Sequence, residues 1–186
     1  MPIRFRASLV VLLFTALAVS ALPARTVPVF EQPLLITSAG QSAEVQLASV
    51  LAKKAELRAT LAKMAGPKDL AGHKTLVLVL GTSLKGLGAA GLDTAKEKER
   101  IKALLAAAEA LGVPVLAMHL GGEARRGALT DEMIAEDLPA ARMAIVVKSG
   151  NKDGLFSKIC RDRGIALVEV ERTLDAVETL RTAFKK

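Results

Sequence analysis

His119 opens a stretch of sequence whose side chains could together perform acid–base chemistry. Glu123, Arg125 and Arg126 follow it closely. A histidine can transfer protons near neutral pH, a carboxylate can orient its ring, and an arginine can clamp a carboxylate or phosphate. The same residues suit a second interpretation, in which His119 is hydrogen bonded at the rim of a pocket and both arginines face solvent. The pattern leaves both interpretations open.

Hydroxyl groups and a glycine follow the first apolar run of the folded part, at Thr37-Ser-Ala-Gly-Gln-Ser42. Backbone amides, the hydroxyls of Ser38 and Ser42, and the start of a helix could hold a phosphate or carboxylate there. The segment is similar to the phosphate loop of flavodoxins, although Ala39 stands where that loop commonly has threonine. In the alternative interpretation, Ser42 is an ordinary helix cap.

A second glycine-rich segment, Gly81 to Gly91, matches the dinucleotide-binding pattern by letter between Gly86 and Gly91. In a dinucleotide site, however, the first glycine directly follows its strand. Here the five residues Gly81 to Lys85 intervene, so we expect a flexible segment over the site instead. Its contacts with an anion would come from Thr82, Ser83 and Lys85.

Apolar runs that predict strands alternate with amphipathic helices along the chain. Leu57, Ala59 and Leu61 alternate with less apolar residues and predict an edge strand, whereas Thr75 to Leu80 predicts a central one. Thr94-Ala-Lys-Glu97 predicts a capping box at the start of a helix. The pattern predicts a single three-layer α/β/α domain with a mostly parallel sheet of about five to six strands, flavodoxin-like or Rossmann-like.

This fold class also predicts where a site would lie. Ligands of open α/β sheets bind beyond the carboxyl ends of the strands. The segments above all follow predicted strands, and so does the segment from Lys148 to Gly154. In that segment Ser149 and Asn151 offer further contacts for a ligand. In the alternative interpretation, Asn151 or Asp153 caps the helix that follows. Glycines and donors therefore gather on one edge of the sheet.

The composition excludes several kinds of site. The chain has 186 residues, of which 51% are hydrophobic, and a formal charge of +7. It has no Trp or Tyr, so flavins, sugars and unstacked bases lack their usual stacking partners. One Cys and two His do not supply a dedicated zinc site. We expect no metal, no cofactor and no nucleic-acid partner.

The N-terminal sequence predicts a targeting signal rather than part of the folded domain. Arg4 and Arg6 precede an apolar run and small residues, the layout of a signal peptide. We expect residues 1–21 to be this signal, residues 22–33 a linker and residues 34–186 the α/β domain. The folded part would then lie in the periplasm or outside the cell, anchored to the membrane if the signal is not cleaved.

The segments Pro33–Ala43, Lys85–Gly91, Gly121–Gly127 and Lys152–Phe156 resemble those of a bacterial family of short exported α/β proteins, labelled as a domain of unknown function. The resemblance supports export and one α/β domain, and it implies no catalytic residues. We expect a protein that binds a small anionic molecule at the carboxyl edge of the sheet. Cations outnumber the acids Glu123 and Asp153 on that edge, and they are Lys85, Arg125, Arg126, Lys148 and Lys152. The alternatives are a hydrolase or transferase using His119 and Glu123, and an interaction module for a membrane transporter or envelope complex. The candidate contacts are Ser38, Gln41, Ser42, Thr82, Ser83, Lys85, His119, Arg125, Arg126, Ser149 and Asn151.

Overall fold

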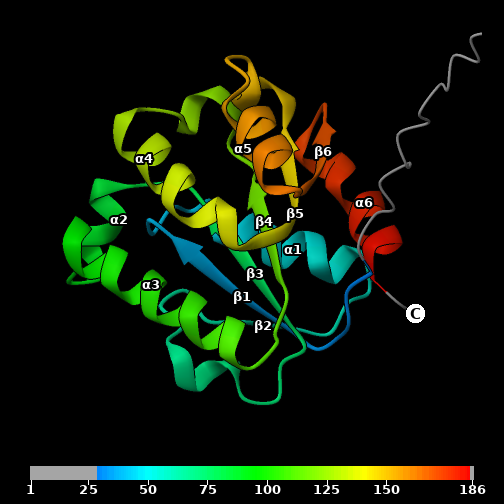
Figure 1. Ribbon diagram of the computed structural model, residues 1–186, viewed down its shortest axis with the longest axis horizontal. Helices are drawn as coiled ribbons and strands as arrows, with labels where there is room; N and C mark the ends of the chain where they lie inside the picture. Colours follow the sequence, from blue (N-terminus) through cyan, green and yellow to red (C-terminus); the bar gives the residue numbers. More distant parts are fainter. Residues whose placement is uncertain (1–28, 185–186) are drawn as a thin grey trace, which may run out of the picture.

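Six apolar runs form parallel strands in the computed structural model, which describes residues 29–184 (Figure 1). The strands join in the order β2-β1-β3-β4-β5-β6. The first five follow the flavodoxin-like order of doubly wound sheets, which confirms the predicted fold class. The strands are β1 (Leu34–Ala39), β2 (Ala59–Leu61), β3 (Thr75–Leu80), β4 (Val115–His119), β5 (Ala141–Val147) and β6 (Ala166–Val170).

Helices cover both faces of this sheet and complete three layers (Figure 1). One hydrophobic cluster joins α1 and α6 to one face, and the other joins α3, α4 and α5 to the opposite face. All six residues of β3 are buried, as its apolar sequence predicts for a central strand. The helices are α1 (Glu44–Lys54), α2 (Leu84–Ala89), α3 (Thr94–Ala110), α4 (Ala128–Asp137), α5 (Leu155–Arg163) and α6 (Ala176–Ala183).

The strand order reverses between β1 and β3. From β1 the chain passes to β2 on one side, and it then crosses to β3 on the other side of β1. β1 and β3 pair over their whole length, from Leu34 with Thr75 to Ala39 with Leu80. Their carboxyl ends therefore lie together at the topological switch point, where such sheets bind ligands.

The predicted capping box of α3 is wrong in its residues. The helix is capped by Asp93, whose Oδ1 accepts a hydrogen bond from the Lys96 amide at 2.8 Å. Glu97 does not turn back to the helix start, because its side chain is fully buried and points toward the end of β1. A second difference concerns Gly86 to Gly91, most of which belongs to the short helix α2 rather than to a flexible segment.

We expect Asp93→Ala to lower the free energy of unfolding by about 1 kcal/mol, because the first turn of α3 loses its cap. Thr94→Ala is the matched control, since Thr94 lies inside the helix and its side chain makes no capping bond. Urea denaturation of both variants measures the difference. A larger loss in the free energy of unfolding for Thr94→Ala would show that Thr94, as predicted from the sequence, is the capping residue.

The predicted signal peptide lies outside the described residues, as does residue range 22–28 of the predicted linker. The rest of that linker packs into the fold. Phe30 is buried, its ring lies 5.6 Å from that of Phe184, and its amide donates to the carbonyl of Ala183 at 2.7 Å. The two ends of the described chain are thus joined beside the start of β1.

Candidate functional site

The connection from β1 to α1 makes a tight turn at the switch point. Gly40 has φ +100°, and a Cβ there would lie only 2.6 Å from the carbonyl oxygen of Gly81, so this position requires glycine. Gln41, with φ +59°, forms an isolated antiparallel bridge with Thr82. The turn after β1 is therefore fastened to the turn after β3.

The buried ion pair of Glu97 and Arg100, both on α3, holds the turn after β1. Glu97 Oε1 accepts hydrogen bonds from the Gly40 amide at 2.8 Å and from Gln41 Nε2 at 3.1 Å. Arg100 pairs with both oxygens of the same carboxylate, at 2.7 Å and 2.9 Å. Arg100 also donates to the carbonyl oxygens of Ser38 and Ala65. The predicted contact Gln41 thus serves, in this structure, to join the turn to α3.

Glu44 is the central acidic group above the switch point. Its Oε1 lies 2.5 Å from Nε of Arg125, whose side chain is 41% exposed. Apart from the contact between Ser42 and Glu44 themselves, its Oε2 and the hydroxyls of Ser42 and Ser38 make no hydrogen bond with any described residue. Burial alone would raise the pKa of Glu44, but hydrogen bonds from the Ser42 hydroxyl, from its own amide and from Arg125 together lower it.

Two glycines lie directly against this group. A Cβ on Gly81 would stand 3.0 Å from Ser42 Oγ and 3.9 Å from Glu44 Oε2. A Cβ on Gly121 would overlap the Arg125 side chain and approach Glu44 Oε1 to 3.1 Å. Backbone without a side chain therefore packs against this group on both sides, and a side chain at either position would crowd Ser42 or Arg125.

His119 is fully buried at the end of β4. Its Nδ1 lies 2.9 Å from the carbonyl oxygen of Leu80, and its Nε2 lies 3.1 Å from that of Gly122. The ring also stacks at a tilt against Phe156, with centroids 5.2 Å apart. Because both neighbours of the ring nitrogens are hydrogen-bond acceptors, a neutral imidazole can donate to only one of them and an imidazolium to both.

Arg126 lies beside the same aromatic ring, with its guanidinium 5.7 Å from the centroid of Phe156. It pairs with Asp153 at 2.7 Å and with Asp131 at 2.5 Å, and it also donates to the carbonyl oxygen of Gly150. Hydrogen bonding from Arg126 lowers the pKa of Asp153 to about 2. Arg126 therefore ties together the loops that follow β4 and β5.

The charges at this edge are balanced, because most of the predicted cations lie beside carboxylates. Lys148 pairs with Glu171 at 2.6 Å, and Lys152 pairs with the exposed Glu123. One interpretation of the sequence had Arg125 and Arg126 facing solvent, but both have carboxylate partners. Lys85, exposed on α2, makes no ion pair with any residue between 29 and 184.

The remaining predicted contacts serve the local structure. The Ser83 hydroxyl caps α2 by accepting from the Gly86 amide at 3.1 Å, and the Thr82 amide donates to the Thr130 hydroxyl. The N-cap of α5 is Gly154 rather than Asn151 or Asp153, although Asn151 Oδ1 accepts a hydrogen bond from the Phe156 amide in the first turn at 2.9 Å. Ser149 is exposed, and its hydroxyl lies close to Gly122.

Glu44 and Glu97 are the residues that sequence reasoning missed. A signal was available for each. Glu97 precedes buried Ile101 by four residues, and Glu44 precedes buried Ala48 by four residues, so both lie in phase with the apolar stripe of their helix. A carboxylate in phase with such a stripe faces the interior and requires a partner there.

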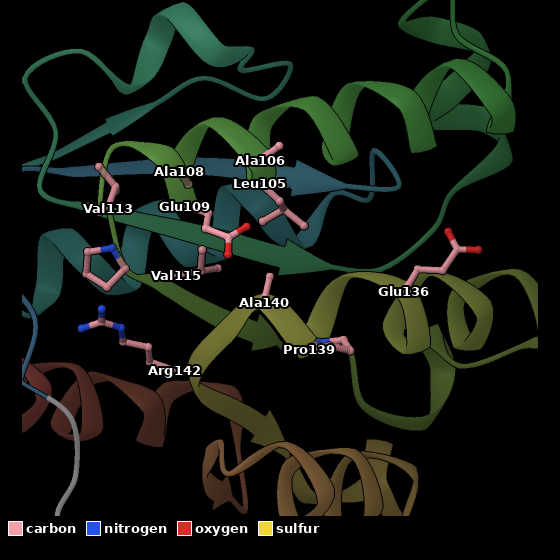
Figure 2. Close-up of a pocket in the computed structure, with 12 residues that line it drawn as sticks. Leu105, Ala106, Ala108, Glu109, Val113, Val115, Glu136, Pro139, Ala140 and Arg142 are labelled. Atoms are coloured by element: carbon pink, nitrogen blue, oxygen red, sulfur yellow. The ribbon is translucent and has the colours of Figure 1, made fainter.

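Two cavities of the described chain lie away from this site. One of about 560 Å³ opens at the amino edge, and Glu109, Ala140 and Arg142 are among the residues that line it (Figure 2). Another of about 510 Å³ lies between α3 and α4 and is bordered by Asp137. Burial, followed by the charges of Glu136 and Glu97, raises the pKa of Asp137 to about 7.

Two features are absent from the part of the chain that the structure describes. Within residues 29–184, no group of three or more His, Cys, Asp or Glu side chains is arranged to hold a metal ion. No helix in the same range combines the length and the hydropathy needed to cross a bilayer.

The fold and the switch-point residues define a doubly wound α/β protein with a polar cluster at the carboxyl edge of its sheet. The chain belongs to the family described as Domain of unknown function (DUF6305), whose model matches residues 31–184. This confirms the resemblance to a domain of unknown function that the sequence predicted. A search of the curated proteins found no significant match.

Two solved structures illustrate the distant likeness of the fold to other proteins. A protein assigned to the G-D-S-L lipolytic family, from Desulfitobacterium hafniense DCB-2, is 12% identical, with a TM-score of 0.34 over 73% of this chain and 75% of that chain. AlinE4, an SGNH-hydrolase family esterase, is 12% identical, with a TM-score of 0.32 over 88% and 86%. Such a likeness carries no argument about activity.

Proposed function

We propose that this protein binds a small anionic molecule at the switch point between β1 and β3, and that it does so outside the cytoplasm. The observation that carries the proposal is how the guanidinium group of Arg125 is hydrogen bonded and exposed. Glu44 fixes its Nε, while its two terminal nitrogens make no hydrogen bond to any described residue and its side chain is 41% exposed. A guanidinium held in this way is oriented to take a carboxylate or phosphate through both terminal nitrogens.

Neighbouring groups support the same choice. Lys85 supplies a positive charge that has no carboxylate partner among residues 29–184, and the turns after β1 and β3 are fastened together beside it. We do not propose a hydrolase or transferase, because both ring nitrogens of His119 contact carbonyl oxygens and Glu123 is ion-paired with Lys152 on the surface. In this proposal His119 and Arg126 build the edge of the sheet, and Arg125 receives the ligand.

Calorimetric titration with propionate, succinate and inorganic phosphate tests the proposal. We expect Arg125→Ala to weaken binding of the best of these anions more than tenfold, because an ionic contact with two hydrogen bonds is lost. Arg142→Ala is the matched control, since Arg142 borders the cavity at the opposite edge. Weaker binding by Arg142→Ala alone would move the ligand to that cavity.

The protein for this titration should be expressed with its own N-terminus and recovered without denaturation. Its intact mass then also reports whether residues 1–21 have been removed. Absence of binding to all three anions would overturn the proposal and favour the alternative of an interaction module for a transporter or envelope complex.

A further inference from the structure

Asp137 is the one acidic residue of α4 that has no cationic partner among residues 29–184. Lys98 of α3 lies 2.5 Å from Glu132 and 2.7 Å from Glu136. The fourth acid of the helix, Asp131, pairs with an arginine of the preceding loop. Asp137 is only 7% exposed, yet its carboxyl group makes no hydrogen bond or ion pair with any residue in this range. Because buried polar groups are almost always hydrogen bonded, a partner for this carboxyl group is missing.

Asp137 lines the cavity of about 510 Å³ between α3 and α4. Its oxygens are not closed to solvent, although the residue is buried, so the carboxyl group is accessible from this cavity. Leu105 and Glu136 border both this cavity and the one shown in Figure 2, so an apolar surface continues from Asp137 toward the amino edge. The wall is completed by Lys98 and by exposed Glu99 and Lys102.

The electrostatics around Asp137 favour a positively charged ligand group. Burial, followed by the charges of Glu136 and Glu97, raises the pKa of Asp137 to about 7. Asp137 is also the last residue of α4, and a helix carries partial negative charge at its carboxyl end. Lys98 and Arg100 act in the opposite direction, but both are hydrogen bonded to other carboxylates. A cation brought to Asp137 would therefore supply the missing partner.

The donor set of this cavity fits an organic cation better than a metal ion. Within residues 29–184, no group of three or more His, Cys, Asp or Glu side chains is placed to hold a metal. A single carboxylate beside an apolar wall instead matches an ammonium group on a carbon chain. We propose that the cavity between α3 and α4 is a second binding site, which takes a protonated primary amine with its ammonium group on Asp137 and its carbon chain along Leu105. None of its lining residues is a contact proposed for the anion.

The test titrates the full chain at pH 8 with n-butylammonium and with 1-butanol, which share a carbon chain and differ in the polar group. An alkylamine is protonated at this pH, as the lysine side chain is. We expect butylammonium to bind more tightly than butanol by about tenfold or more, because its hydrogen bond joins two charged groups. Changes in backbone amide chemical shifts measure both affinities.

Asp137→Asn ties this preference to the cavity. Asparagine keeps the shape of the side chain and removes its charge, so butylammonium should bind the variant no more tightly than butanol does. Asp162→Asn is the matched control, since it makes the same change at an exposed position on α5 and should retain the preference.

A lower pH gives a second readout. Protonation of Asp137 removes its negative charge, so the affinity for butylammonium should fall by about tenfold or more between pH 8 and pH 5.5. The charged groups that act on Asp137 are Glu136 of its own helix and Glu97, Lys98 and Arg100 of α3. The affinity of Asp137→Asn should not change over this range, which would assign the loss to Asp137 rather than to these neighbours.

The outcomes keep this proposal separate from anion binding. Equal affinity of the unaltered protein for butylammonium and butanol would overturn it, and so would a preference that survives in Asp137→Asn. Absence of any binding of butylammonium would overturn it as well. Each of these results leaves the proposed function in place, because that function is measured with carboxylates and phosphate at Arg125.

Discussion

Replacing Glu97 with alanine is expected to lower the free energy of unfolding by about 3–5 kcal/mol, the largest effect of any single change considered. The variant leaves Arg100, whose side chain is only 12% exposed, without its carboxylate. It also leaves the Gly40 amide and the Gln41 side chain without the acceptor that holds the turn after β1. An unpaired buried charge and an unsatisfied amide are each costly.

Urea denaturation followed by circular dichroism measures this loss. Glu99→Ala is the matched control, because Glu99 lies on the same helix and is exposed, so its replacement should change stability by less than about 0.5 kcal/mol. A loss for Glu97→Ala no larger than for Glu99→Ala would show that the ion pair contributes nothing to the turn.

Replacing Asp137 with asparagine is expected to raise stability at pH 8 by up to about 4 kcal/mol, the free-energy equivalent of its pKa shift. Burial raises the pKa of this carboxyl from 3.8 to about 7 in the folded protein. Between these two values the unfolded chain releases a proton that the folded chain keeps, so stability falls as the pH rises. The contribution of Asp137 to the stability of the wild-type protein should therefore be most favourable below about pH 4.

Thermal or urea unfolding at a series of pH values checks the sign of this effect. The asparagine variant should lose the decline in stability between about pH 4 and pH 7, and it should match the wild-type protein at the acidic end. Asp162→Asn makes the same chemical change at a half-exposed position on α5 and should not alter the profile. If the stability of the wild-type protein did not change between about pH 4 and pH 7, the raised pKa of Asp137 would be contradicted.

The fold could be predicted from the sequence because its elements are locally encoded. The apolar run of Thr75–Leu80 identifies a strand covered on both faces, and the structure places it as β3 at the centre of the parallel sheet. The alternation around Ala59 and Leu61 identifies an edge strand, and β2 is that edge. Such patterns need only neighbouring residues.

The partners of the charged side chains could not be predicted in the same way. Glu44 and Arg125 are separated by 81 positions, and Arg126 and Asp153 by 27. Their contacts depend on how the loops after β1, β4 and β5 meet across the sheet, which no local period encodes. Counting cations along the predicted edge therefore overestimated its net charge, because the carboxylate of Glu44 belongs to a helix.

Helical phase gives part of this information. Glu44, Glu97 and Asp137 each lie three or four residues from a buried apolar residue of the same helix. In each helix the acid therefore faces the interior, and all three are buried. For His119 no comparable signal exists, since its contact with the carbonyl oxygen of Leu80 depends on the pairing of β3 with β4.

The contact between Phe30 and Phe184 determines how the molecule can be handled. It brings the two ends of the described chain together beside the start of β1, as Figure 1 shows, while Gly40 and Gly81 lie at the far ends of β1 and β3. A sensor chip or affinity tag attached through either end would therefore leave the carboxyl ends of the strands facing the solution. Immobilised protein should consequently bind small acids as well as dissolved protein does.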